Sequence, residues 1–68
     1  MKPNKLKKLR EEAGLSQMDL AIKSHIAMNT ISSLENGKVF PYPGWRKRLA
    51  EALRVDEAAI FPGYQEKE

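Results

Sequence analysis

The sequence predicts an all-α domain of five short helices, and three observations support this fold class. Turn-forming residues divide the 68-residue chain into short segments, apolar residues recur at helical spacings within them, and strand-like alternation is absent. The chain contains no cysteine, so neither disulfides nor thiolate zinc sites can replace an apolar core. A domain of this length buries only about 60% of the surface that its unfolded chain exposes, and we therefore expect modest stability.

The first predicted helix begins at a cap on Asn4 and ends at about Ala13. Leu6 and Leu9 share one face with Ala13, and Gly14 can end the helix in the left-handed conformation. Lysines in its first turns oppose the helix dipole, which disfavours each cation there by about 0.3 to 1 kcal/mol. Their presence therefore indicates a role other than helix stability.

A second helix is predicted over about residues 17–23, and its start has the strongest signal in the chain. Ser16 and Asp19 have the spacing of a capping box, in which each side chain accepts a hydrogen bond from the backbone of the other residue. Leu15 and Leu20 have the spacing of a hydrophobic staple across the same helix start. The helix is therefore expected to begin directly after Ser16.

A third helix is predicted over residues 28–35, beyond a tight turn. Ile31 and Leu34 lie one turn apart on its apolar face, and Asn36 with Gly37 provides a C-terminal stop. The opposite face carries only uncharged residues: Met28, Asn29, Ser32, Ser33 and Asn36. A solvated helix face usually holds Glu, Lys or Arg, and because residues 24–34 contain none of them, we expect a contact surface.

The side chains on this uncharged face suit the base edges of double-stranded DNA. Asn29 can bind an adenine edge through two hydrogen bonds, and Met28 can contact a thymine methyl group. Ser32 or Ser33 can form hydrogen bonds with most bases. We therefore expect these four residues to make base contacts.

A loop over residues 38–44 is predicted next, because Pro41 and Pro43 interrupt the helical hydrogen-bond ladder. Apolar residues at every fourth position then indicate a fourth helix: Trp45, Leu49 and Leu53. Asp56 is expected to cap a brief fifth helix that ends near residues 61–63. The domain is expected to span residues 1–63, followed by a frayed tail over residues 64–68.

The net charge of +3 is unevenly distributed along the chain. One basic cluster lies at the start (Lys2, Lys5, Lys7, Lys8 and Arg10) and a second near the end (Arg46, Lys47, Arg48 and Arg54). Solubility explains any single lysine equally well. Together the two clusters favour a polyanionic partner such as DNA, which they would attract through release of its counterions.

Residues 15–21 (LSQMDLA) and 31–38 (ISSLENGK) resemble the helix-turn-helix of the phage repressor/Cro family, the lambda repressor-like or Xre-type domains. The resemblance extends from about Leu6 to Phe61, nearly the whole chain. It implies a five-helix domain with its helix-turn-helix at about residues 16–36. The third helix of such a domain enters the major groove, and the start of the second rests on the phosphate backbone.

The resemblance also implies roles for residues outside the base-reading face. Gln17 is expected to place its backbone N–H and its amide on a phosphate, with Asn36 and Lys38 holding the DNA backbone further along. Arg10 and Glu35 are expected to form a structural ion pair between the first helix and the end of the third.

Three positions depart from the family pattern: His25 and Arg54 stand where glycine is common, and Ala27 stands where a hydroxyl usually caps the third helix. Trp45 is expected in the core rather than as a stacking platform, because its helical partners are leucines. Phe40 and Tyr42 have three possible roles: packing over the core, a dimer contact, or a bond from the Tyr42 hydroxyl to a phosphate.

These features predict sequence-specific binding to a double-stranded DNA operator by a transcriptional regulator of the repressor type. One recognition helix reads few base pairs, so we expect a homodimer on a two-fold related operator. The alternative is a protein-binding module of the same fold, such as an antitoxin-like subunit.

The residue inventory argues against an enzyme. There is one histidine, no cysteine and no glycine-rich phosphate loop, so we expect no cofactor, metal or small-molecule ligand. No apolar run approaches the roughly 20 residues needed to cross a bilayer, and the start of the chain lacks the apolar core of a signal peptide. We therefore expect a cytoplasmic protein without a membrane partner.

Overall fold

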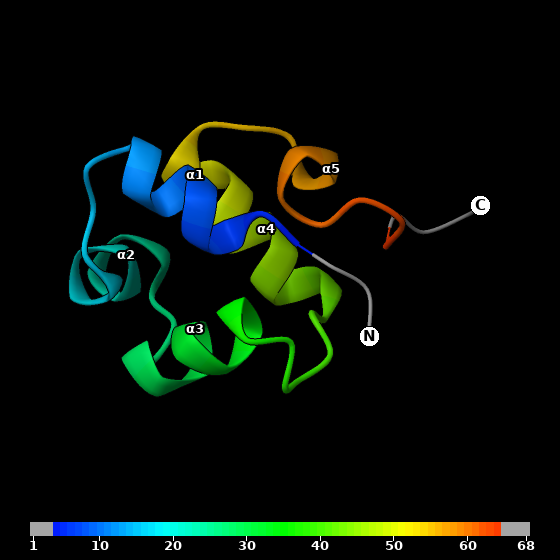
Figure 1. Ribbon diagram of the computed structural model, residues 1–68, viewed down its shortest axis with the longest axis horizontal. Coiled ribbons are helices and arrows are strands. Elements are labelled where there is room, and N and C mark those ends of the chain that lie inside the picture. Colours follow the sequence, from blue (N-terminus) through cyan, green and yellow to red (C-terminus); the bar gives the residue numbers. More distant parts are fainter. Residues whose placement is uncertain (1–3, 65–68) are drawn as a thin grey trace.

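The computed structural model describes residues 4–64, and within that range it contains five helices and no strand. The helices are α1 (Leu6–Glu12), α2 (Gln17–Ser24), α3 (Met28–Glu35), α4 (Pro43–Leu53) and α5 (Glu57–Ile60). Helix α4 packs against α2 and α5, while α3 packs against α1 and α2 (Figure 1). The prediction of a five-helix, all-α fold is confirmed.

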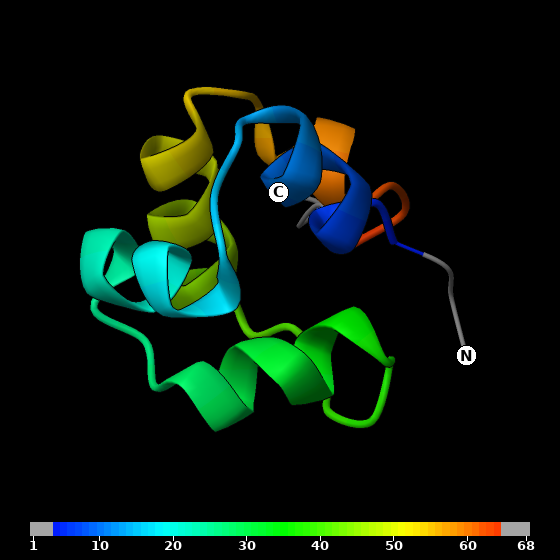
Figure 2. The same cartoon turned by 60° about the vertical axis from the view of Figure 1, so that its left-hand side comes forward.

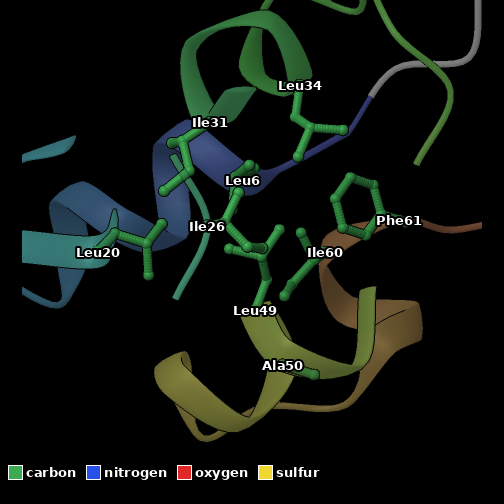
Figure 3. Close-up of a cluster of buried hydrophobic side chains, with 9 residues drawn as sticks. All are labelled: Leu6, Leu20, Ile26, Ile31, Leu34, Leu49, Ala50, Ile60 and Phe61. Carbon is green, nitrogen blue, oxygen red and sulfur yellow. The ribbon is translucent and has the colours of Figure 1, made fainter. Parts of the chain in front are cut away.

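One apolar core joins all five helices. Its buried members are Leu6, Leu20, Ile26, Ile31, Leu34, Leu49, Ala50, Ile60 and Phe61 (Figure 3). Burying a side chain the size of leucine or isoleucine stabilises the fold by about 1.5 to 3 kcal/mol. Ile31 and Leu34 point from α3 into this core, so the rotation of α3 about its own axis is fixed by packing.

The predicted capping box at the start of α2 is present. The Ser16 hydroxyl accepts a hydrogen bond from the Asp19 N–H at 2.9 Å, and an Asp19 carboxylate oxygen accepts one from the Ser16 N–H, also at 2.9 Å. The bond from the Ser16 N–H to the carboxylate lowers the pKa of Asp19, because it favours the ionised form. Leu20 is buried and Leu15 packs against the core, as expected for a hydrophobic staple. The start of α2 is therefore fixed by both polar and apolar contacts.

The two residues that replace a common glycine adopt the left-handed conformation. His25 ends α2 and Arg54 ends α4, and each has a φ of 59°. This conformation costs a non-glycine residue about 1 to 2 kcal/mol relative to the right-handed one. Ala27 lies at the N-cap position of α3, where no side chain caps the helix. All three departures from the family pattern therefore lie at helix ends: His25 after α2, Ala27 before α3 and Arg54 after α4.

The start of α4 and the cap of α5 differ from the sequence predictions. Helix α4 begins at Pro43 rather than after Gly44, because proline at the first helical position loses no ladder hydrogen bond and its ring presets φ. Asp56 occupies the N-cap position of α5, but its side chain makes no capping hydrogen bond. The Asp56 backbone carbonyl instead accepts a bond from the Ala59 N–H.

The two ends of the described chain are also tied to the fold. Lys5, and not Asn4 as predicted, occupies the N-cap position of α1, but the Asn4 side chain accepts a bond from the Leu6 N–H at 3.0 Å from one residue earlier. Tyr64, assigned to a frayed tail by the sequence, packs against the core and contacts the ring of Phe61. That assignment is wrong for Tyr64, and the rest of the expected tail lies outside the described residues.

The cap and turn of the second and third helices give a stability prediction. Ala27→Ser supplies a hydroxyl at an empty N-cap, and His25→Gly removes the strain of a left-handed histidine. Each change is expected to stabilise the fold by up to about 1 kcal/mol. For a domain of this size that gain raises the thermal midpoint by about 4 to 8 °C, measurable by circular dichroism. Ser16→Ala should lower the midpoint, and no increase in either of the first two variants would contradict the assignment.

Candidate nucleic-acid interface

The uncharged face of α3 projects away from the core. Met28 is 44% exposed, Asn29 and Asn36 are exposed, and Ser32 and Ser33 are half-buried. Ile31 and Leu34, on the opposite face, are completely or almost completely buried. In Figure 2, α3 and the loop that follows it form the lower edge of the molecule. The four residues expected to contact bases are thus brought together on one accessible helix face.

The carboxylate of Glu35 joins three segments at the end of α3. Arg10 in α1 donates from Nε to Glu35 Oε2 at 2.6 Å, and this ion pair is almost entirely shielded from solvent. Gln17 in α2 donates from Nε2 to Glu35 Oε1 at 2.9 Å. Arg10 also donates from Nη1 to the Leu15 carbonyl at 2.7 Å, at the end of the turn before α2. The start of α2 is therefore held beside the end of α3.

The hydrogen bond to Glu35 raises the pKa of Arg10, outweighing the opposite effect of burial. Arg10 is therefore a permanent cation in this pair. Arg10 also belongs to the first basic cluster of the sequence, but its guanidinium binds Glu35 and the Leu15 carbonyl. The lysines of that cluster within the described residues, Lys5, Lys7 and Lys8, are exposed. Lys2 lies outside the described residues.

The side chain of Gln17 makes a hydrogen bond within the protein that the sequence did not predict. Its amide was expected to face a phosphate, and the structure shows the amide nitrogen bonded to Glu35. An amide nitrogen carries two hydrogens, so one remains for another acceptor. The backbone N–H of Gln17, at the first position of α2, is one of the donors that a helix start leaves without an intrahelical partner. Both donors suit a phosphate oxygen.

A Schellman motif places Lys38 at the end of α3. The Gly37 N–H bonds to the Leu34 carbonyl and the Lys38 N–H bonds to the Ser33 carbonyl at 2.8 Å. Gly37 makes this possible because it adopts a φ of 70°. Asn4 adds a bond from its Nδ2 to the Leu34 carbonyl at 2.9 Å, which ties α1 to the same helix end. The Lys38 side chain is exposed.

Phe40 and Tyr42 lie outside the core, at 52% and 58% exposure, so core packing is wrong for both. The Phe40 ring makes edge contacts with Tyr42 and Tyr64, at centroid distances of 4.9 and 5.5 Å. Tyr42 in turn contacts Trp45, which is partly buried against the core as expected. We call Phe40, Tyr42 and Tyr64 the aromatic patch. It extends from the loop after α3 to the end of the described chain.

Arg46 belongs to the interior and not to a basic surface. It is 1% exposed, and it donates from Nη1 to the Pro41 carbonyl at 2.7 Å and from Nε to Glu57 at 3.2 Å. Its assignment to the second basic cluster is therefore wrong, although the other three members are exposed. The helical spacing contained the signal, because position 46 lies three and four residues before the buried Leu49 and Ala50.

The family model described as a helix-turn-helix domain matches residues 4–60. The chain belongs to this helix-turn-helix family. The domain is of the Xre-like kind, and the match spans all five helices. Membership in this helix-turn-helix family indicates DNA binding. No match was found among curated proteins.

The described part of this helix-turn-helix domain contains neither a metal-binding cluster nor a membrane-spanning helix. Within residues 4–64, no three side chains among His, Cys, Asp and Glu are grouped closely enough to hold a metal ion. Every helix in that range is too short or too polar to cross a lipid bilayer. Because the family indicates DNA binding, the outward face of α3 and its flanking segments are the candidate site.

Glu35→Gln tests the contribution of the carboxylate that joins α1, α2 and α3. The change leaves the buried Arg10 cation without its counter-charge, which typically costs about 3 kcal/mol or more. We expect the midpoint of urea unfolding to fall strongly. Glu12→Gln, an exposed change on α1, serves as the control and should alter stability by no more than about 0.5 kcal/mol. Equal midpoints for the two variants would show that the ion pair does not hold the helices together.

Proposed function

We propose that this protein binds a specific DNA operator as a homodimer and regulates transcription in the manner of phage repressor/Cro proteins. The observation that carries this proposal is the outward, uncharged face of α3, which Ile31 and Leu34 hold in place from below. Family membership supports DNA binding, and the side chains of α3 supply the chemistry for sequence readout.

Base contacts would begin in the first turn of α3. The N-terminal residues of a recognition helix reach the base edges in this class of domain. Met28 and Asn29 are both exposed there, and their side chains suit a thymine methyl group and an adenine edge. Ser32 and Ser33 follow one turn later and can bond with most bases. At the positions that Met28 and Asn29 contact, the readout favours A·T pairs.

Phosphate contacts would flank α3 on both sides. Gln17 lies beside the end of α3 through its bond to Glu35, and Asn36 and Lys38 follow α3 directly. The hydroxyl of Tyr42, a residue that is 58% exposed, extends the set into the loop. Such contacts fix the register of the protein on DNA and carry no base information themselves. The exposed lysines of α1 add a longer-range attraction.

The aromatic patch is the surface that we assign to dimer formation. A large exposed ring such as Phe40, with no polar atom to bind solvent or phosphate, indicates an interaction site when it clusters with other rings. Two domains joined there would present their recognition helices to half-sites about one helical turn apart. Tyr42 can serve both roles, because its ring lies in the patch and its hydroxyl is polar.

A second candidate function is a protein-binding module, such as an antitoxin-like subunit. Met18 and Ile22, one turn apart on α2, are 57% and 68% exposed and form a separate apolar stripe. This stripe favours a protein contact. Selection of duplexes from a random pool separates the two functions, because a DNA-binding regulator would enrich a two-fold motif and lose affinity steeply with salt. Failure to enrich any motif would favour the protein-binding module.

Asn29→Ala and Lys38→Ala should weaken DNA binding in different ways. Loss of a base contact by Asn29→Ala is expected to cost about 1 to 3 kcal/mol on the selected operator and to leave non-specific binding unchanged. Lys38→Ala should weaken binding to all sequences similarly and reduce the salt dependence. Fluorescence titrations on operator and scrambled duplexes would measure both. Equal losses on the two duplexes for Asn29→Ala would refute its role in base readout.

Phe40→Glu should weaken self-association on the operator. A carboxylate placed in the aromatic patch would have to be desolvated in the dimer, so sedimentation should show more of the complex with one protein per duplex. Ile22→Glu places the same charge on the exposed stripe of α2 and serves as the matched control. A dimer that survives Phe40→Glu and dissociates with Ile22→Glu would transfer the interface to α2.

A further inference from the structure

Arg46 is a charged side chain among the largest fully buried residues of the described chain. Burying an ion pair is weak evidence for a contribution to stability, because apolar residues of similar volume often stabilise a fold equally well or better. The position lies on the core side of α4, where Leu49 and Ala50 follow. A guanidinium there therefore calls for a role that an apolar side chain could not perform.

The bonds of Arg46 connect α4 to two other segments. Its backbone N–H donates to the Tyr42 carbonyl at 3.0 Å and its Nη1 donates to the Pro41 carbonyl at 2.7 Å, so one residue binds two successive carbonyls. Its Nε donates to Glu57 in the first turn of α5. Glu57 is partly exposed and thus orients the guanidinium from the solvent side. Arg46 therefore joins the end of the loop to α4 and α5.

The loop over residues 38–42 is held at both ends. Its start is fixed by the bond from the Lys38 N–H to the Ser33 carbonyl. Near its end, Pro41 is buried and has no N–H, so its carbonyl is its only strong backbone hydrogen-bonding group. Arg46 binds that carbonyl. The exposed side chain of Lys38 lies at the first of these two fixed points, and that of Tyr42 lies directly after the second.

We propose that Arg46 is a positioning residue, which holds the loop over residues 38–42 so that Lys38 and Tyr42 meet the DNA backbone beside the recognition helix. Its own charge is buried and does not contact DNA. This inference rests on the proposed DNA binding and adds to it an internal residue that sets phosphate contacts from beneath the surface. Arg48 is exposed on the same helix and contributes only its charge, so the two arginines of α4 can be separated by mutation.

Arg46→Met and Arg48→Met form a matched pair on one helix. Both remove one positive charge, but Arg48 is exposed and its loss measures the effect of net charge alone. We expect Arg46→Met to weaken binding to all duplexes by at least about five-fold more than Arg48→Met, and to reduce the salt slope by about one further unit. Titrations would be made at a temperature where circular dichroism shows both variants folded.

Two measurements on the free protein report the loop without DNA. Trp45 is the sole tryptophan and contacts the Tyr42 ring, so its emission should shift in Arg46→Met and not in Arg48→Met. The N–H at position 46 bonds to the Tyr42 carbonyl at the end of the loop, and its amide exchange should accelerate in Arg46→Met while that of α3 is unchanged. Glu57→Gln retains an oxygen acceptor for Nε and should preserve both loop signals. Glu57→Gln also tests the proposal if Arg46→Met does not fold. If Glu57→Gln changes the tryptophan emission and the loop exchange, the charge of Glu57, and not the bond of Arg46 to the Pro41 carbonyl, holds the loop, and the proposal is wrong.

The results distinguish a failure of the positioning role of Arg46 from a failure of the proposed DNA binding. Faster loop exchange with weaker binding in Arg46→Met, relative to Arg48→Met, would support the proposal. Unchanged loop exchange, or equal DNA affinities for the two variants, would overturn the role of Arg46 while leaving DNA binding intact. A wild-type chain that binds no duplex would overturn the proposed function, and the contribution of this loop to DNA contact would fall with it.

Discussion

The carboxylate of Glu35 is the interaction on which the geometry of the site depends. It lies at the last position of α3 and receives Arg10 from α1 and Gln17 from α2, so three helices meet at one shielded group. Helices of seven or eight residues have little stability alone, and tertiary contacts must set their positions. The Glu35 contacts hold the start of α2, where we propose a phosphate contact, beside the helix proposed to read bases.

The remaining constraints on α3 come from its own two faces. Ile31 and Leu34 fix the rotation of the helix, and the Schellman motif at Gly37 fixes its end and the first residue of the loop. Because these apolar and backbone contacts hold α3 in place, its outward side chains are not needed for packing, which suits the base contacts that we propose. The buried Arg46 acts in the same way on the loop, because its guanidinium binds the backbone carbonyl of Pro41 and leaves the exposed side chains of the loop unconstrained.

Local signals in the sequence predicted most of the fold. The capping box at Ser16 and the left-handed Gly37 are determined by residues within one turn, so the start of α2 and the bounds of α3 were predicted closely. Two of the failures depend on distant contacts. Burial of Arg46 requires the Pro41 carbonyl and Glu57 across the fold, and the bond of Gln17 to Glu35 requires α3 to end beside α2. Such pairings have no local signature, although the helical spacing of position 46 did mark its inward direction.

The central claim is that the uncharged face of α3 lies against base edges in the major groove. Nuclear Overhauser effects between the protein and a selected operator duplex test it most directly. We expect contacts from the Met28 methyl group to a thymine methyl and from the Asn29 amide to adenine protons, with α4 and α5 distant from the bases. Contacts confined to the exposed side of α4 and α5, with Met28 and Asn29 unaffected by DNA, would contradict the account.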